Sequence, residues 1–166
     1  GYASSDYLSW PVFAPVLMLM LSGVATSAGS TGGGIKMVRM LILLKQAQRE
    51  LTRLVHPNAV QPVRLGGRVV GNPMIFSVLA FMLVYVATLL LLSMVLLLTD
   101  LDPVTAFSAV MASLHCMGPG LGAIGPTSTY AVLTDFQVWV CTLAMVLGRL
   151  EILSFLALLT PAFWRR

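Results

Sequence analysis

The sequence predicts an all-α integral membrane protein, and three observations carry that prediction. Of the 166 residues, 58% are hydrophobic and 10% are charged, whereas soluble domains carry about 25% charged residues. The mean hydropathy is +0.91. Long uncharged runs alternate with short charged connections, and a chain in lipid must pair its backbone polar groups within helices. The lipid bilayer is therefore the expected environment.

Four runs with few or no charges predict helices of different lengths. Residues 73–99 are uncharged and long enough to cross the bilayer with some tilt. Residues 131–160 are long enough as well, although they include three charged side chains. Residues 11–28 meet glycine after about a dozen apolar residues, and residues 103–114 are brief. Both are too short for a crossing, which takes about 20 residues.

The distribution of charge orients these runs across the bilayer. Seven of the ten Lys and Arg residues lie within residues 36–68, and two more end the chain. By the positive-inside rule, this stretch and the C-terminus are cytoplasmic, whereas residues 1–10 and 100–135 face outward. Residues 103–114 then start and finish outside. The sequence therefore predicts that they form a re-entrant half-helix.

The half-helix has a favourable start and an irregular continuation. Asp102 is a good N-cap, and Pro103 suits the first helical position. The C-terminal end would point into the membrane, where its partial negative charge favours a cation. The next segment, HCMGPGLGAIGP (residues 115–126), is tolerated at membrane depth only where it is buried or lines water. This layout is typical of a cation filter made of backbone carbonyls, although aquaporins and other transporters also use half-helices.

Four motifs along the chain resemble a known family. They are GSTGGGIK, HPNAV, GPGLG and GRLE, which begin at residues 29, 56, 118 and 148. The chain resembles the Trk-type potassium uptake proteins of the Trk/Ktr/HKT superfamily, over essentially its whole length. The resemblance implies a potassium-channel-like fold of four helix–pore-helix–helix repeats around one pore. It also implies uptake of potassium, as substrate, across the bacterial cytoplasmic (inner) membrane.

The chain is similar to the C-terminal third of such a protein, with the last one and a half repeats. Residues 1–68 would end the third repeat, with a filter end, a broken inner helix carrying an intramembrane loop, and a cytoplasmic extension. Residues 69–166 would form the complete fourth repeat. Its predicted parts are an outer helix over about 71–99, a pore half-helix over 102–115, a filter over 116–122 and an inner helix over 131–162.

In this family each repeat contributes one filter glycine, whose neighbouring carbonyls replace the water around the ion. The motifs match Gly1 and Gly120 to that role, and glycine rather than serine resembles the potassium-selective members. For Gly120 an ordinary tight turn is the alternative. The predicted filter residues are Gly1, Tyr2, Gly118, Pro119, Gly120 and Leu121.

His115 and Cys116 stand where family members often carry two asparagines. Two adjacent side chains supply too few ligands for a transition-metal site. A packed or filter-supporting histidine is therefore expected, and potassium at the filter carbonyls is the metal ion implied. No bound cofactor is expected.

The glycine-rich stretch over residues 23–34 matches the family's intramembrane loop, which hangs across the pore below the filter as a gate. Glycine lets the helix break, and a water-filled pore satisfies the freed backbone. The predicted gate residues are Gly29, Ser30, Thr31, Gly32, Gly33, Gly34 and Arg149. A GxxxG-type helix-packing face is the alternative. A phosphate-binding P-loop is rejected, because Ile35 follows the last glycine and Lys36 comes one place late.

Arg149 follows about seventeen mostly apolar residues. A charge at mid-membrane costs roughly 2.5–3.5 kcal/mol on insertion scales, so such residues usually face a cavity or a partner. The resemblance implies that Arg149 projects into the pore near the loop and repels a cation. An arginine reaching the cytoplasmic interface is the alternative. Glu151 lies on a different helix face and is expected to pair with another helix.

The stretch from Lys45 to Arg68 predicts a helix before Pro57 that protrudes into the cytoplasm. The resemblance implies a homodimer that rests on a cytoplasmic nucleotide-binding regulatory ring, with contacts at this stretch and at residues 164–166 of the cytoplasmic C-terminus. Nucleic-acid binding is disfavoured, because membrane topology accounts for the net charge of +4.

No nucleophile–base pair or carboxylate pair stands out in the sequence, so an enzyme is not expected. The alternative function is that of a truncated, non-conducting membrane fragment, which acts only through helix packing or cytoplasmic partner contacts. The sequence leaves open whether transport would be coupled to protons or to sodium.

Overall fold

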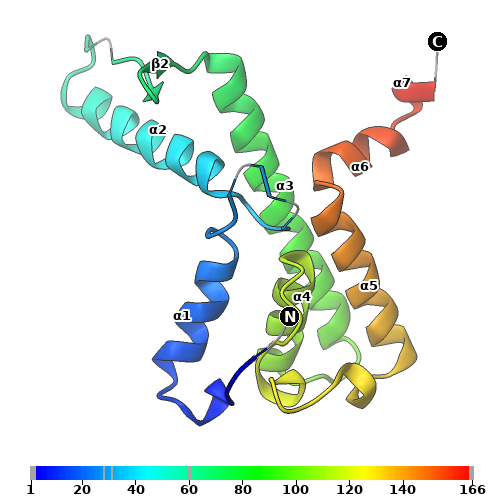
Figure 1. The fold of residues 1–166 in the computed structure, drawn as a ribbon. Coiled ribbons are helices and arrows are strands. Elements are labelled where there is room, and N and C mark those ends of the chain that lie inside the picture. Colours follow the sequence, from blue (N-terminus) through cyan, green and yellow to red (C-terminus); the bar gives the residue numbers. More distant parts are fainter. Residues whose placement is uncertain (1–2, 28, 31, 60, 165–166) are drawn as a thin grey trace.

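The computed structural model describes residues 3–27, 29–30, 32–59 and 61–164, and most of them are helical (Figure 1). The α-helices are α1 (Phe13–Ser22), α2 (Met37–Val55), α3 (Asn72–Leu97), α4 (Pro103–Leu114), α5 (Asp135–Arg149), α6 (Ile152–Leu159) and α7 (Pro161–Trp164). They are accompanied by the 3-10 turns η1 (Tyr7–Ser9), η2 (Gly122–Ile124) and η3 (Tyr130–Val132), and by the antiparallel strands β1 (Arg64–Leu65) and β2 (Arg68–Val69).

α3 is long enough to cross a bilayer by itself. Its 26 residues extend for about 39 Å at 1.5 Å per residue. Within the described residues, no other single helix combines this length with an apolar sequence, although α5 and α6 together pass as a second if the bent pair is one span. A long helix is therefore present where the outer helix was predicted, over about 71–99.

α4 forms the centre of the core. It is only 12 residues long, and nine of them are buried, because α3 and α5 pack against it along its length (Figure 1). Leu96 of α3, Val110 of α4 and Ala144 of α5 are all inaccessible to solvent. At its start, the Asp102 carboxylate accepts a hydrogen bond from the Thr105 amide at 3.1 Å. The predicted short helix and its cap are therefore present.

The inner helix predicted over about 131–162 is divided into two helices, a break that the sequence did not predict. α5 ends at Arg149 and α6 starts at Ile152, with a bend of 102° between them. At the break, Glu151 has φ +56°, a left-handed conformation that ends the helical hydrogen-bond ladder. Its carboxylate is held by two cations from another part of the chain, so tertiary contacts stabilise the break.

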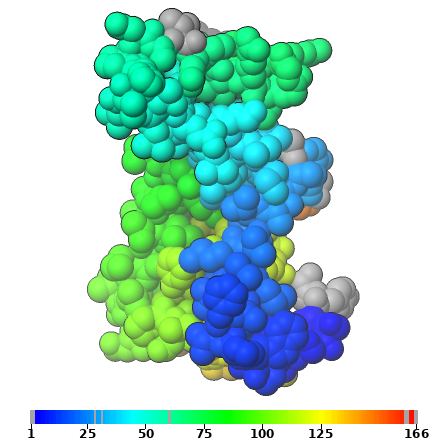
Figure 2. Space-filling view, turned by 90° about the vertical axis from the view of Figure 1, so that its left-hand side faces the viewer, coloured from blue at the N-terminus to red at the C-terminus, as the bar shows by residue number. Residues whose placement is uncertain are grey.

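α1 and α2 belong to the other half of the chain and are joined by the glycine-rich loop. α1 stops at Ser22, and no helix is assigned to the described residues between it and Met37, as predicted for the loop. The Ile35 amide donates to the Gly23 carbonyl at 2.8 Å, so the two legs of the loop lie side by side. Figure 2 shows α1 low on this face, with α2 and the β1–β2 hairpin above it.

Candidate functional site

Residues 116–121 follow α4, and we call them the filter segment after the role predicted for them. The segment turns away from the helix through two residues in the left-handed region. Cys116 has φ +54° and Gly118 has φ +102°. Leu121 is extended, with φ −116° and ψ 166°. The irregular backbone predicted over residues 116–122 is therefore present directly after the short helix.

Three of the four carbonyls that were predicted to bind an ion in this segment accept a hydrogen bond from a side-chain hydroxyl. The pairs are Tyr130 with Gly118 at 2.8 Å, Tyr7 with Gly120 at 2.9 Å, and Ser108 with Leu121 at 3.2 Å. The Pro119 carbonyl has no such partner within the described residues. A carbonyl oxygen has two lone pairs, so the paired carbonyls keep a second acceptor position.

The three hydroxyl donors come from different elements and were missed by the sequence analysis. Tyr7 lies in η1, Ser108 in α4 and Tyr130 in η3. Tyr7 and its partner glycine are 113 residues apart in the chain, and no short motif links positions at that distance. The filter segment is thus held by side chains of three elements that lie outside the glycine motif.

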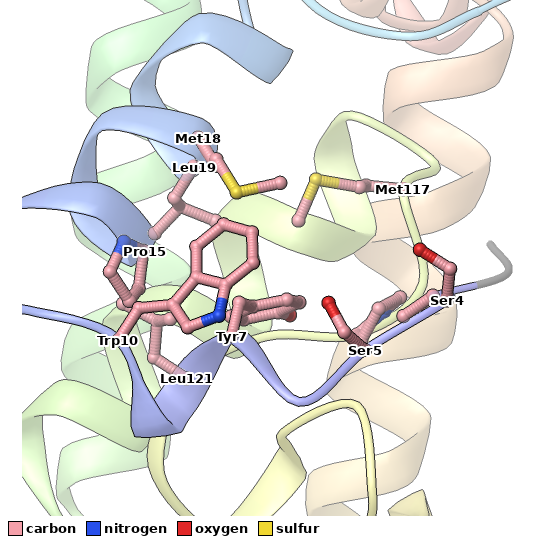
Figure 3. A pocket seen from close by; sticks show the side chains of 11 residues that line it. Ser4, Ser5, Tyr7, Trp10, Pro15, Met18, Leu19, Met117 and Leu121 are labelled. Carbon is pink, nitrogen blue, oxygen red and sulfur yellow. The ribbon is translucent and has the colours of Figure 1, made fainter.

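A cavity of about 330 Å³ lies between the filter segment, α1 and the N-terminal stretch (Figure 3). Met18 of α1 and Met117 of the filter segment reach towards one another across it, beside the Trp10 ring. Ser4 and Ser5 line its other side. The predicted filter residues Gly1 and Tyr2 lie outside the described residues, but the residues that follow them are next to the segment after α4.

The glycine-rich loop and Arg149 meet at a second cavity, of about 360 Å³. Of the predicted gate residues, Ser30, Gly32 and Gly34 line it together with Arg149. Thr31 lies outside the described residues. Because none of these described glycines lies on a helix, the alternative of a GxxxG helix-packing face is wrong. The structure therefore brings together one end of α5 and a loop more than a hundred residues earlier in the chain.

Two glycines allow close backbone contact with the C-terminal end of α4. A Cβ atom placed on Gly33 of the loop would overlap the Leu114 carbonyl oxygen and lie 3.1 Å from the His115 carbonyl carbon. A Cβ on Gly148 of α5 would overlap the same Leu114 oxygen. Gly33 is therefore a packing contact, whereas Gly29 has nothing within 4 Å of its Cβ position.

The C-terminal leg of the loop is tied to the break between α5 and α6. The Glu151 carboxylate accepts hydrogen bonds from Lys36 at 2.6 Å and from Arg39 at 2.8 Å. The Arg39 guanidinium also lies over the Phe81 ring, 4.1 Å from its centre, a cation–π contact. The expectation that Glu151 pairs with another helix is confirmed, and Lys36 and Arg39 are the partners that the sequence did not identify.

His115 is packed, as expected. Its side chain is buried, its Nδ1 is 2.8 Å from Ser22 Oγ, and its Nε2 is 2.5 Å from the Tyr85 hydroxyl. Within the described residues, no group of three or more His, Cys, Asp or Glu side chains is placed to hold a metal ion. The ring thus connects the end of α4 to both α1 and α3.

Comparison with known proteins agrees with the arrangement of these elements. The TrkH family, described as cation transport protein, matches residues 1–165. The chain is 41% identical over 165 residues to the Trk system potassium uptake protein TrkH of Vibrio parahaemolyticus, covering 99% of this chain and 34% of that protein. It is 40% identical over 167 residues to the Trk system potassium uptake protein TrkG of Escherichia coli K12, again covering 99% and 34%.

The fold is shared with a solved structure. The crystal structure of the potassium transporter TrkH from Vibrio parahaemolyticus matches 99% of this chain and 35% of its own, with a TM-score of 0.90 at 41% identity. The chain thus spans about a third of the length of these relatives. The relatives are named as potassium uptake proteins or a potassium transporter, and none of them as an enzyme. The chain belongs to the TrkH family of cation transport proteins.

Proposed function

We propose that this chain forms the last one and a half of four helix–pore-helix–helix repeats in a potassium uptake pore of the bacterial cytoplasmic membrane. Residues 1–68 would end the third repeat, and residues 69–166 would form the fourth. One observation carries the proposal: the glycine-rich loop, the end of α5 and the filter segment all converge on the C-terminal end of α4, as the contacts of Gly33 and Gly148 with Leu114 indicate.

Ion selection is assigned to the filter segment. The carbonyls of residues 118–121 would replace the hydration shell of potassium, together with those of Gly1 and Tyr2 from the third repeat. The α4 dipole, negative at its C-terminal end, favours a cation there. The hydroxyls of Tyr7 and Tyr130 hold this backbone in place.

Gating is assigned to the glycine-rich loop and Arg149. Ser30, Gly32 and Gly34 of the loop line a cavity with Arg149, and a fixed positive charge at this place would repel a passing cation. Movement of the loop away from Arg149 would open the path.

The partners are proposed from the charge distribution and the family. α2 and the β1–β2 hairpin carry Lys45, Arg49, Arg53, Arg64 and Arg68. We assign this basic surface and the C-terminus to the cytoplasmic side. There the surface would contact a nucleotide-binding regulatory ring beneath a homodimer.

Rubidium uptake tests the proposal in bacteria that lack potassium uptake. Two proteins are expressed: the 166-residue chain, and a chimera in which this chain replaces the matching third of Vibrio parahaemolyticus TrkH. We expect uptake by the chimera, and its loss on Gly120→Asp, which places a charge beside Ser108 and Ile124. Ala123→Asp, at an exposed position three residues away, is the matched control and should keep uptake.

The outcomes separate the proposal from its alternative. Uptake by the chimera but not by the chain alone assigns this chain to part of a pore. Uptake by neither, with the chimera present in the membrane at the level of the parent protein, overturns the potassium proposal. The alternative of a non-conducting fragment that acts through helix packing or cytoplasmic contacts would then stand.

A further inference from the structure

His115 occupies the junction of three elements. It is the C-cap residue of α4, and its side chain is 6% exposed. Its ring bonds to Ser22, the last residue of α1, and to Tyr85 of α3. Those two partners lie 93 and 30 residues away in the chain, so the contact joins the two halves of the molecule.

The hydrogen bonds determine which ring nitrogen carries the proton. The Ser22 hydroxyl lies 2.6 Å from the Leu19 carbonyl and donates its single hydrogen there. Towards His115 it can therefore only accept, which assigns the ring hydrogen to Nδ1. Nε2 then accepts from the Tyr85 hydroxyl. A neutral imidazole has one donor and one acceptor nitrogen, and both are used.

The loop packs on the same residue from both of its legs. A Cβ atom on Gly23, at the start of the loop, would lie 2.7 Å from His115 Cε1. On the other leg, a Cβ on Gly33 would lie 3.2 Å from His115 Cα. The Ile35 amide joins the legs through the Gly23 carbonyl. Both ends of the loop are thus built around His115, while Gly29 at its centre is open.

We propose that His115 is a positioning residue, a clasp that holds the glycine-rich loop on the end of α4 and so couples the loop to the filter segment. The proposal rests on the function proposed above, in which the loop is the gate. His115 is one residue before the filter segment, so its ring connects the loop to the start of that segment. Without the clasp, the loop would leave the position seen here more often.

The test measures loop exposure and uptake in the same chimera. A Gly29→Cys reporter is suitable because the position is exposed and open. Cys116→Ser and Cys141→Ala remove the two thiols of this chain, and any cysteine in the rest of the chimera is replaced by serine. The rate of reaction with a charged maleimide reports on the loop, independently of transport. Maximal rate and KM for rubidium uptake report on the gate and the filter.

Substitutions at both ends of the clasp distinguish it from general packing. Tyr85→Phe and Ser22→Ala each remove one hydrogen bond and little volume. We expect each to raise the reaction rate about fivefold, as for the loss of one net hydrogen bond, and to change the maximal uptake rate more than KM. His115→Phe keeps an aromatic side chain but loses both hydrogen bonds, so adding Tyr85→Phe or Ser22→Ala should then raise the reaction rate no further.

His115→Asn and His115→Gln offer partial rescue. The Asn amide takes a position close to Nδ1 and can reach Ser22, and the Gln amide takes a position close to Nε2 and can reach Tyr85. Both should react more slowly than His115→Phe. The clasp would be overturned if His115→Phe, Tyr85→Phe and Ser22→Ala reacted with the maleimide at the rate of the unsubstituted reporter chimera. Additive effects in the double variants would overturn it as well.

The two proposals fail in different ways. If the unsubstituted chimera takes up no rubidium but the clasp variants change the thiol reaction as expected, the gate assignment fails and the clasp stands. If the chimera transports and the variants leave the reaction rate unchanged, the clasp alone fails.

Discussion

The filter segment and the glycine-rich loop are both irregular glycine-containing backbone, but they are held in different ways. In the filter segment, hydroxyls from three elements donate to the carbonyls of Gly118, Gly120 and Leu121. The loop is anchored at its legs, through Gly23 and Gly33 around His115 and through Lys36 to Glu151. Its centre faces a cavity.

This difference suits two different tasks. In the proposed filter, a backbone that replaces the hydration shell of an ion must keep its carbonyls in place, and the hydroxyl bonds hold three of them. A backbone that moves between two positions needs fixed ends and a free centre. The four predictions below test this contrast, in order of expected effect on stability.

The largest effect is expected at the anchored leg of the loop. Gly33→Ala places a methyl group against the Leu114 carbonyl oxygen, where backbone on both sides cannot yield. Overpacking of this kind costs about 1–3 kcal/mol, so we expect a clear fall in the apparent Tm and in the amount of folded protein in the membrane. Gly29→Ala is the matched control, and equal losses in both variants would contradict an anchored leg.

A smaller loss is expected at the ion pair that ties the loop to the broken helix. Glu151→Gln leaves Lys36 and Arg39 without their shared counter-charge. Because the glutamate is 37% exposed, solvent screens part of the interaction, and we expect about 1 kcal/mol of destabilisation. Thermal unfolding in detergent measures it. Glu50→Gln, which disturbs exposed pairs on α2, should shift the Tm less, and the reverse order would argue against the tie.

In the filter segment, Tyr7→Phe removes the hydroxyl that donates to the Gly120 carbonyl. The expected loss is again about 1 kcal/mol, but it should be accompanied by a lower preference for rubidium over sodium in uptake by the chimera. Thr142→Val, which removes an exposed hydroxyl bonded within α5, is the control for hydroxyl loss. Unchanged ion preference in Tyr7→Phe would mean that the hydroxyl supports only the fold.

The smallest change in stability is expected at the loop centre. Ser30→Ala removes an exposed hydroxyl that accepts from the Gly32 amide at 3.2 Å, and exposed substitutions usually stay within about 0.5 kcal/mol. The maximal rate of rubidium uptake should nevertheless change, because the residue lines the cavity with Arg149. A Tm loss as large as that of Gly33→Ala would remove the contrast between centre and leg.

Much of the fold follows from local sequence. The uncharged run before Thr99 predicts α3, Asp102 and Pro103 predict the start of α4, and the glycines after Ser22 predict the end of α1. Each of these depends on residues within a few positions of one another, through helix length, capping and glycine's low helix propensity. The same holds for the irregular backbone after Leu114.

The remaining features depend on contacts between distant residues. Glu151 breaks the inner helix in a conformation stabilised by Lys36 and Arg39, which lie 115 and 112 positions earlier, and the apolar run alone did not predict the break. The hydroxyl of Tyr7 finds Gly120 in the same way.

By itself, the sequence predicted a helical membrane protein with a short half-helix, a loop and a basic segment, because hydropathy, charge and glycine act locally, and its motifs resemble those of the Trk type. Only the tertiary structure decided what holds the loop and the filter segment, since hydrogen bonds and ion pairs across the fold require both partners to be placed. His115 illustrates both levels: its burial was expected, whereas its bonds to Ser22 and Tyr85 appear only in the folded chain.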